Sequence, residues 1–309
     1  MTTFTFDKLV IFGVGLIGGS LARGLRERAG AARGGRIVGV GRSRASVERA
    51  RDLGVVDDVA SLDDDAQLRA ALAGADLVLL AAPVAQTGPL LDRIAPFLDD
   101  ATIVTDAGST KSDVVSAARA SLGARAARFV PGHPIAGRES SGVEAALPDL
   151  YVGRNVILCP LAENRPADVA RIEALWRATG AQVTTMSHEQ HDRVLASVSH
   201  LPHLLSFALV ERILSAPDAA LKFSFAAGGF RDFTRIAASS PEMWRDVCLA
   251  NRDALVEELD GYTAVLAQLR AAIVAGDGTK LEAVFARSRE ARSQWQERGG
   301  RASGDAALK

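Results

Sequence analysis

The feature that most constrains this chain is a glycine-rich turn near its N-terminus. An apolar run, Leu9–Phe12, leads into Gly13-x-Gly15-x-x-Gly18, and an amphipathic helical pattern follows directly. Glycines at this spacing allow a tight turn, a close approach of the backbone to a pyrophosphate, and close packing of the helix against the strand. The helix start offers free N–H groups and a partial positive charge to phosphates. A strand, a glycine turn and a helix in this order predict a dinucleotide-binding site.

Short apolar runs alternate with amphipathic helical stretches over the first half of the chain. This alternation predicts a mostly parallel sheet with helices on both faces, which is a Rossmann-type, doubly wound α/β fold. Ligands of such sheets bind at the carboxyl ends of the strands, so the residues directly after each strand are candidates for a site. The predicted strands are Leu9–Phe12, Arg36–Val40, Leu77–Ala81, Thr102–Thr105, Arg128–Val130 and Val156–Cys159.

The pattern changes from His188 onward, because strand-like runs stop and apolar residues recur at helical spacing. One long apolar helix is predicted from about His191 to Ser215, with Pro202 as a kink point. Two further amphipathic helices are predicted at 251–275 and 279–298. The predicted domains are a dinucleotide-binding domain at 1–186, an all-α substrate and dimerisation domain at 187–298, and a disordered tail at 299–309.

Composition excludes several classes of partner. A chain of 309 residues with 48% apolar and 24% charged residues is typical of a globular protein of about two domains. The net charge of −1 gives no electrostatic footprint for nucleic acid or an anionic membrane surface. No signal peptide and no apolar run long enough to cross a bilayer was identified. Cys159 and Cys248 are expected to be buried thiols in a reducing cytoplasm, rather than a disulfide or a metal site.

The residues after the second predicted strand bear on which cofactor binds. An NAD-preferring site usually has an acidic residue here, which binds the ribose 2′-hydroxyl. This chain has Gly41, followed by Arg42, Ser43 and Arg44. Guanidinium groups suit a 2′-phosphate, so the pattern favours NADP or tolerance of it. The alternative is that both arginines are solvated surface charges.

Three loops that follow later strands carry candidate groups. Ala82 and Pro83 would let a flat cofactor lie close to the third predicted strand. Ser109 lies near a helix start, where it either caps the helix or reaches a nicotinamide or substrate oxygen. Lys111 opposes the dipole of that helix, which indicates a pairing or binding role. His133 is held between glycine and proline, where an imidazole either is structural or acts as an acid or base near neutral pH.

The helical half adds two histidines and an arginine. His200 and His203 are three residues apart and project from similar sides of a helix. No Asp, Glu or Cys lies beside them in a zinc-like pattern, so we predict no metal. The segment 228–235 is either a capped helix in which Asp232 pairs with an arginine, or a site in which Arg235 holds a carboxylate with its planar fork.

Taken together, these motifs resemble the prephenate dehydrogenase family, also called cyclohexadienyl or arogenate dehydrogenases, of tyrosine biosynthesis. The resembling motifs are Gly-Val-Gly-Leu-Ile-Gly-Gly-Ser at 13–20, Asp-Ala-Gly-Ser-Thr-Lys at 106–111, Gly-His-Pro-Ile-Ala-Gly at 132–137, Ser-His-Leu-Pro-His at 199–203, Gly-Gly-Phe-Arg-Asp-Phe-Thr-Arg at 228–235 and Pro-Glu-Met-Trp at 241–244. The resemblance implies an oxidative decarboxylation of prephenate to 4-hydroxyphenylpyruvate and carbon dioxide, with NAD or NADP. It leaves prephenate versus arogenate open, and the apolar helical half makes a homodimer the expected assembly.

The resemblance also implies roles for individual residues. His133 would take the proton of the ring hydroxyl as hydride departs, and Ser109 would bridge that hydroxyl, His133 and the nicotinamide. Arg235 would bind a substrate carboxylate, and His203 would hold the substrate. The implied substrate-binding residues are Arg235, His203, Glu139 as a gate acting through Arg231, and Trp244 in the pocket wall. The candidate cofactor-binding residues are Gly13, Gly15, Leu16, Ile17, Gly18, Arg42, Ser43, Arg44, Ala82, Pro83 and Ser109.

Two other functions compete with this interpretation. A β-hydroxyacid or imine reductase of the same architecture typically relies on a lysine in the helical domain, and residues 187–235 contain only Lys222. A dinucleotide sensor without catalysis would leave Ser109, His133 and Arg235 with no reason to occur together.

Overall fold

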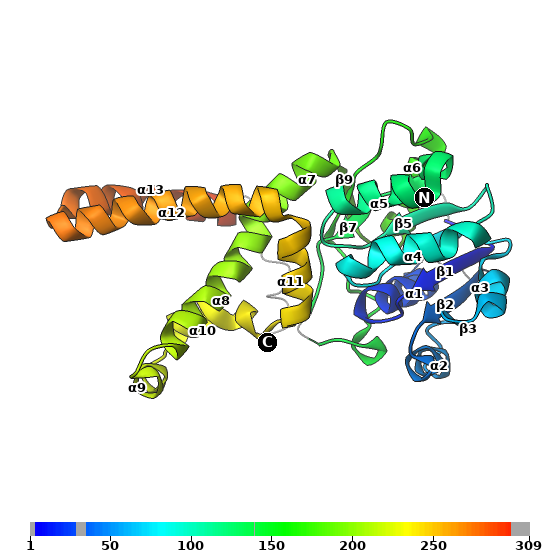
Figure 1. Ribbon diagram of the computed structural model, residues 1–309, viewed down its shortest axis with the longest axis horizontal. Coiled ribbons are helices and arrows are strands. Elements are labelled where there is room, and N and C mark those ends of the chain that lie inside the picture. The colour runs from blue at the N-terminus through cyan, green and yellow to red at the C-terminus, as the bar shows by residue number, and fades with distance from the viewer. Residues whose placement is uncertain (1–3, 29–34, 139, 298–309) are drawn as a thin grey trace. The chain divides into compact units, whose positions relative to one another are not determined.

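Figure 1 shows the computed structural model, which describes residues 4–28, 35–138 and 140–297. The chain divides into two compact units, residues 1–252 and 253–309, and each is considered by itself. The predicted tail at 299–309 lies outside the described residues, as does Glu139.

The first unit is built on a six-stranded sheet in the order β3-β2-β1-β4-β5-β6, in which every neighbouring pair is parallel. The strands are β1 (Lys8–Phe12), β2 (Arg36–Gly41), β3 (Asp58–Ser61), β4 (Leu77–Leu80), β5 (Ile103–Asp106) and β6 (Phe129–Val130). The strand order reverses at β1, since β2 and β4 lie on either side of it. A doubly wound sheet binds its ligand at this reversal, outside the carboxyl ends of the strands.

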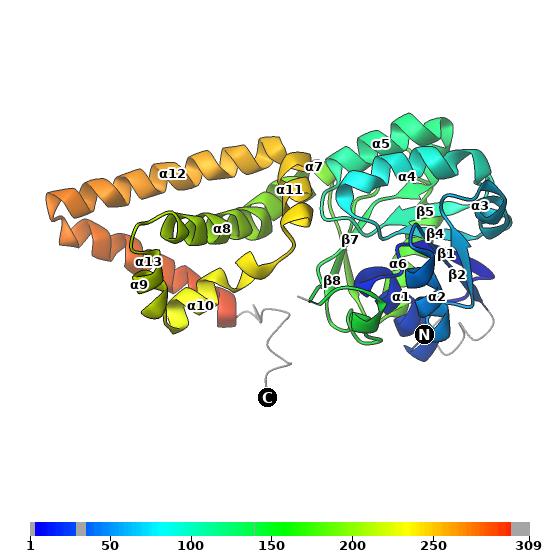
Figure 2. The same ribbon diagram turned by 60° about the horizontal axis from the view of Figure 1, so that its bottom comes forward.

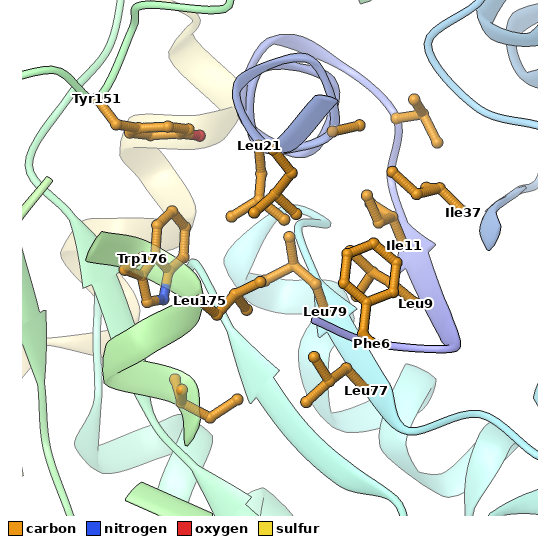
Figure 3. Packing of buried hydrophobic residues seen from close by; sticks show 14 of the residues in the cluster. Phe6, Leu9, Ile11, Leu21, Ile37, Leu77, Leu79, Tyr151, Leu175 and Trp176 are labelled. Atoms are coloured by element: carbon orange, nitrogen blue, oxygen red, sulfur yellow. The ribbon is translucent and has the colours of Figure 1, made fainter. Parts of the chain in front are cut away.

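Helices cover both faces of this sheet (Figures 1 and 2). Side chains alternate along β1, so Leu9 and Ile11 join one buried cluster while Val10 and Phe12 join another. The first cluster includes residues of α1 and α6, among them Leu21 and Trp176 (Figure 3), and the second includes residues of α3, α4 and α5. The helices are α1 (Leu16–Arg28), α2 (Arg44–Asp52), α3 (Asp65–Leu72), α4 (Thr87–Ile94), α5 (Ser112–Leu122) and α6 (Pro166–Ala178), with short 3-10 turns at Val84–Gln86, Ala95–Phe97, Gly123–Arg128 and Val143–Ala145.

A second, three-stranded sheet corrects the prediction that Val156–Cys159 extends the main sheet. Its strands are β7 (Gly132–Pro134), β8 (Asn155–Leu158) and β9 (Gln182–Thr185). β7 is antiparallel to β8, and β9 is parallel to it. Glycine and proline are depleted in strands, so the sequence Gly-His-Pro did not predict a strand. In the structure β7 is an edge strand that pairs with β8. The short and partly polar strands β3 and β9 were also not predicted.

After β9, the described chain is helical, joined by short turns. The predicted boundary at 186/187 stays a prediction. The remaining helices are α7 (His188–Leu195), α8 (Leu201–Leu214), α9 (Ala219–Ser224), α10 (Gly228–Thr234), α11 (Pro241–Ala250), α12 (Arg252–Ala275) and α13 (Gly278–Glu297), with a π-helical turn at Ala196–His200 and a 3-10 turn at Arg235–Ala238.

The first two of these form one continuous helix, His188–Leu214. The π-helical turn ends two residues before Pro202, whose ring would clash with the carbonyl of Val198 in a regular helix. An 18-residue window of this helix has a mean hydropathy of 1.3, with 28% of the window buried. By length and composition alone the helix could cross a membrane, which corrects the statement that no run is long enough. The core helix of a soluble protein meets the same criterion, so this observation assigns no location.

In the second unit, α12 is followed closely by α13. Gly276 ends α12 with φ +66, where glycine carries no Cβ penalty, and Asp277 donates its N–H to Ala272 O at 2.9 Å. Both helices carry exposed apolar side chains, among them Ile273, Val274 and Trp295.

Candidate active site

A cleft of about 1130 Å³ opens at the carboxyl ends of β1, β2 and β4. Gly13 has φ +92, and a Cβ there would lie 2.5 Å from Ala81 O, so the turn itself requires glycine. A Cβ on Gly18 would lie 2.7 Å from the Ile11 side chain, so this glycine serves helix–strand packing. Gly15 differs, because a Cβ there would meet nothing within 4 Å. No contact within the described protein therefore requires glycine at position 15, and the open space there suits the close approach of a pyrophosphate.

The predicted cofactor-binding residues are placed in three ways. Those that line the cleft are Gly13, Gly15, Arg42, Ser43, Ala82 and Pro83. Leu16, Ile17 and Gly18 instead form the first turn of α1, where Leu16 and Ile17 pack against the buried core. Ser109 lies on the loop after β5, outside the cleft lining.

Arg44 is not among the residues that line the cleft, so its predicted cofactor contact stays a prediction. It is the first residue of α2, and its Nε lies 2.7 Å from Glu48 Oε1, one turn along the helix surface, with the arginine side chain 83% exposed. Ser43 is the N-cap of α2, and its Oγ accepts the Ser46 N–H at 3.3 Å. The turn at Ser43 therefore directs Arg42 into the cleft and Arg44 away from it. Asp63 also lines the cleft, so an acid that suits a 2′-hydroxyl and an arginine that suits a 2′-phosphate are both present.

A chain of three polar side chains begins at His133. β7 places this half-buried imidazole so that its Nδ1 lies 2.9 Å from Nε2 of His191 on α7. His191 is fully buried, and its Nδ1 lies 2.8 Å from Asp192 Oδ1. Burial lowers the pKa of His133 well below its usual value, and its electrostatic interactions with His191, Lys111 and His200 lower it further against the opposing charge of Asp192. His133 is therefore neutral near neutral pH, as a general base must be.

Asp192 also caps the helix that follows the Ser109 loop. Its Oδ1 accepts the Lys111 N–H at 2.9 Å and its Oδ2 accepts the Ser112 N–H at 2.7 Å. The cap of α5 thus comes from α7, and neither Ser109 nor Thr110 caps the helix. Burial raises the pKa of Asp192, but hydrogen bonds from His191, Ser112 and Lys111 outweigh burial and lower it to about 2.

Lys111 forms a fully buried ion pair with Asp106, which confirms the predicted pairing role. Asp106 Oδ2 also accepts the Gly108 N–H at 2.8 Å, and its Oδ1 accepts the Gly132 N–H at 3.0 Å. One carboxylate at the end of β5 therefore fastens both the Ser109 loop and the strand that carries His133.

His200 and His203 have different environments, although they are three residues apart. Asn251 donates from Nδ2 to His200 Nδ1 at 3.0 Å and to the Asp192 carbonyl at 2.7 Å, and burial lowers the pKa of His200 to about 4. His203 stacks on Trp244, with ring centroids 3.6 Å apart at 20°. Across the described ranges, no group of three or more His, Cys, Asp or Glu side chains could hold a metal ion.

Arg235 begins the 3-10 turn after α10, and this turn packs against α8. Its charge contributes, after burial, to lowering the pKa of His203, so the two side chains are near neighbours. α11, which carries Trp244, packs against the 3-10 turn that follows Pro83 at the cleft. Arg231 is exposed on α10, and the gate implied with Glu139 stays a prediction because Glu139 lies outside the described residues.

Sequence reasoning missed His191, Asp192 and Asn251. His191 and Asp192 lie in the polar run Ser187–Arg193, so no local pattern distinguished them from their exposed neighbours. Cys159 is buried as predicted, whereas Cys248 is only half-buried.

The doubly wound sheet, the glycine-lined cleft at its carboxyl edge and the neutral His133 on β7 are the features of a Rossmann-type oxidoreductase. The family model "Prephenate dehydrogenase, nucleotide-binding domain" matches residues 21–185, and "Prephenate dehydrogenase, dimerization domain" matches residues 187–287. The chain belongs to the prephenate dehydrogenase family.

Individual relatives agree with this membership. Cyclohexadienyl dehydrogenase of Zymomonas mobilis is 36% identical over 289 residues, which cover 93% of this chain and 95% of that protein. The crystal structure of prephenate dehydrogenase from A. aeolicus, in complex with hydroxyphenyl propionate and NAD+, is 35% identical with a TM-score of 0.87, covering 95% of this chain and 99% of that chain. Arogenate dehydrogenase of Synechocystis is 28% identical with a TM-score of 0.78, covering 93% and 99%.

Proposed function

We propose that this chain oxidises and decarboxylates prephenate to 4-hydroxyphenylpyruvate and carbon dioxide, with NAD or NADP as the hydride acceptor. The observation that carries the proposal is His133, a neutral imidazole held at the carboxyl edge of the sheet in a member of this family. Arogenate is the alternative substrate, because one of the similar solved structures is an arogenate dehydrogenase.

The chain's own residues would carry out the proton transfers. Bound in the cleft, an oxidised nicotinamide would supply the hydride acceptor. His133 removes the proton of the ring hydroxyl while a hydride leaves the carbon that bears this hydroxyl. The bond to the ring carboxylate then breaks, carbon dioxide leaves, and the electron pair passes through the ring to the former hydroxyl oxygen. That oxygen recovers the proton from His133, so the product is a phenol and the histidine is neutral again.

The other candidate residues would bind and orient the substrate. Ser109 would hydrogen-bond the ring hydroxyl from the loop that Asp106 and Lys111 fasten. Arg235 would hold a substrate carboxylate, and the stacked pair of His203 and Trp244 would form an adjacent wall. Positioning of this kind lowers the barrier because the reacting groups need no further ordering.

The test is an absorbance assay for reduced nicotinamide, in which prephenate and arogenate are each combined with NAD and with NADP. Reduction in any pair supports the reaction class, and the ratios of kcat/KM settle both specificities. No reduction in all four, with a protein shown to be folded by circular dichroism, would reject the proposal.

We expect Arg42→Asp to lower kcat/KM for NADP by roughly 10–100-fold and to shift preference towards NAD. Arg42 lines the cleft where the ribose 2′ group would lie, and a carboxylate there would repel a phosphate and accept a hydroxyl. Arg44→Asp is the matched control, since Arg44 pairs with Glu48 outside the cleft lining. If kcat/KM for NADP were unchanged in Arg42→Asp, Arg42 would be a solvated surface charge that does not bind the cofactor.

We expect Arg235→Gln to raise KM for substrate by roughly 10–100-fold, with a smaller effect on kcat, because a bidentate carboxylate contact is lost. Lys222→Gln serves as the control, because Lys222 is exposed and pairs with Asp218 at 2.6 Å. An effect of Arg235→Gln confined to cofactor affinity would contradict its role. A large loss in Lys222→Gln would favour the lysine-dependent reductases instead.

We also propose a homodimer formed through the helical half. The matching family model is described as a dimerization domain, and α12 and α13 expose Ile273, Val274 and Trp295. Light scattering coupled to size exclusion tests this, and a monomer at micromolar concentration would reject it. A cytoplasmic location and the absence of nucleic-acid and membrane partners remain proposals, which cell fractionation would test.

A further inference from the structure

We infer that His191 and Asp192 are positioning residues that hold His133 in the single tautomer able to accept the substrate proton at Nε2. The inference deepens the proposed function and rests on it for its catalytic meaning. The three side chains are connected by hydrogen bonds of 2.9 Å and 2.8 Å, and they join β7 to α7 across 58 residues of sequence.

The direction of this chain of hydrogen bonds follows from Asp192. An ionised carboxylate only accepts, so the hydrogen in its bond with His191 belongs to His191 Nδ1. A neutral imidazole carries one hydrogen, which leaves His191 Nε2 as an acceptor. His133 must then donate from Nδ1, because that atom lies 2.9 Å from His191 Nε2. The remaining nitrogen of His133, Nε2, keeps its lone pair and can act as the base.

The opposite arrangement would disable the base. If His191 carried hydrogens on both nitrogens, it would donate to His133 Nδ1, and a neutral His133 would then hold its hydrogen on Nε2. The ionisable groups that face His133 are His191, Lys111, His200 and Asp192. Lys111 is paired with Asp106 rather than with His191. A single hydrogen, on Nδ1, is sufficient for His191 to satisfy Asp192, and its Nε2 then remains an acceptor for His133.

The same pair would stabilise the charge that forms during the reaction. When His133 accepts a proton it becomes a cation, and its Nδ1–H bond to His191 strengthens. The negative charge of Asp192, on the far side of His191 from His133, then stabilises this cation. The Asp192 carboxylate is fixed in position, because its two oxygens accept the Lys111 and Ser112 N–H groups. The arrangement is analogous to the acid that orients the histidine of a hydrolase triad.

Three substitutions of His191 separate orientation from simple packing. His191→Leu removes the acceptor, and we expect kcat to fall by roughly 10²–10⁴-fold with little change in cofactor Kd. His191→Gln keeps a carbonyl that can accept a hydrogen bond from His133 Nδ1. We therefore expect its kcat to be at least about tenfold higher than that of His191→Leu. His191→Asn is the matched control, because its shorter amide can reach Asp192 but not His133. Equal kcat in the Gln and Asn variants, at equal thermal stability, would overturn the inference.

A direct measurement needs no substrate, and its decisive readout uses the wild-type protein. Nitrogen-15 labelling of the five histidines, with long-range proton–nitrogen correlation, reports which ring nitrogen of each carries hydrogen. We expect wild-type His133 with hydrogen on Nδ1 at neutral pH, and a mixture of tautomers in His191→Leu. Hydrogen on Nε2 in the wild type would overturn the inference. If the wild type showed this tautomer but no dehydrogenase activity, the proposed function would fail and the structural assignment would stand.

Discussion

We expect the His133→Asn variant to lose roughly 10²–10⁴-fold in kcat while its affinity for NAD or NADP is unchanged. Asparagine removes the only group at this position that can accept a proton, yet it retains a polar side chain of similar reach. His133 lies outside the residues that line the cofactor cleft, so dinucleotide binding should not depend on it. Initial rates measure kcat, and quenching of protein fluorescence measures cofactor Kd.

His188→Asn is the control for this substitution. His188 is also a partly buried histidine that bonds Ser112, at 3.2 Å, but it does not contact His133. A His133→Asn variant with near-normal kcat would exclude His133 as the base. The pH profile of the wild type gives a second check, because protonated His133 cannot accept a proton. Since burial lowers the pKa of His133 well below 6.5, kcat/KM should start to fall only below that pH.

The largest expected effect on stability is that of Lys111→Met, which we expect to lower the free energy of unfolding by about 3–5 kcal/mol. Lys111 and Asp106 have side chains that are 0% and 1% exposed, so removing the lysine leaves a buried carboxylate without its counter-ion. Asp106 cannot turn towards solvent, because Gly108 and Gly132 N–H groups hold its oxygens. Urea unfolding followed by circular dichroism measures the change.

Lys222→Met is the matched control, because its ion pair with Asp218 is exposed and such pairs contribute about 0–1 kcal/mol. The double variant Lys111→Met/Asp106→Asn should recover part of the loss, since the amide removes the unpaired charge and keeps one acceptor. A loss below about 1 kcal/mol in Lys111→Met would show that water or another cation reaches Asp106.

Buried apolar runs were sufficient to predict five of the six strands of the main sheet, each to within about two residues of its observed ends. β3 and β7 carried no such signal, because Asp-Val-Ala-Ser is half polar and Gly-His-Pro contains two residues that disfavour strands. Pairing with neighbours made strands of both. The small second sheet, which places His133, was therefore beyond prediction from local patterns.

Arg42 and Arg44 show the same limit at a single turn. Both belong to one basic cluster in the sequence, and the composition of that cluster favours a 2′-phosphate. The structure separates them, because α2 begins at Arg44 and its side chain meets Glu48 one turn later. Sequence could indicate the charge but not which of the two guanidinium groups faces the cleft.

The sequence by itself determined the glycine turn, the helices and the residue types of the site. Gly13 is needed for a positive φ and Gly18 for a close helix–strand contact, and both requirements act within a few residues of chain. Only the tertiary structure decided the partners of His133. His133 meets His191 across 58 positions, and Asp192 meets Lys111 across 81. Local backbone preferences carry no information about such contacts, because they depend on how β7, α5 and α7 pack after each has formed.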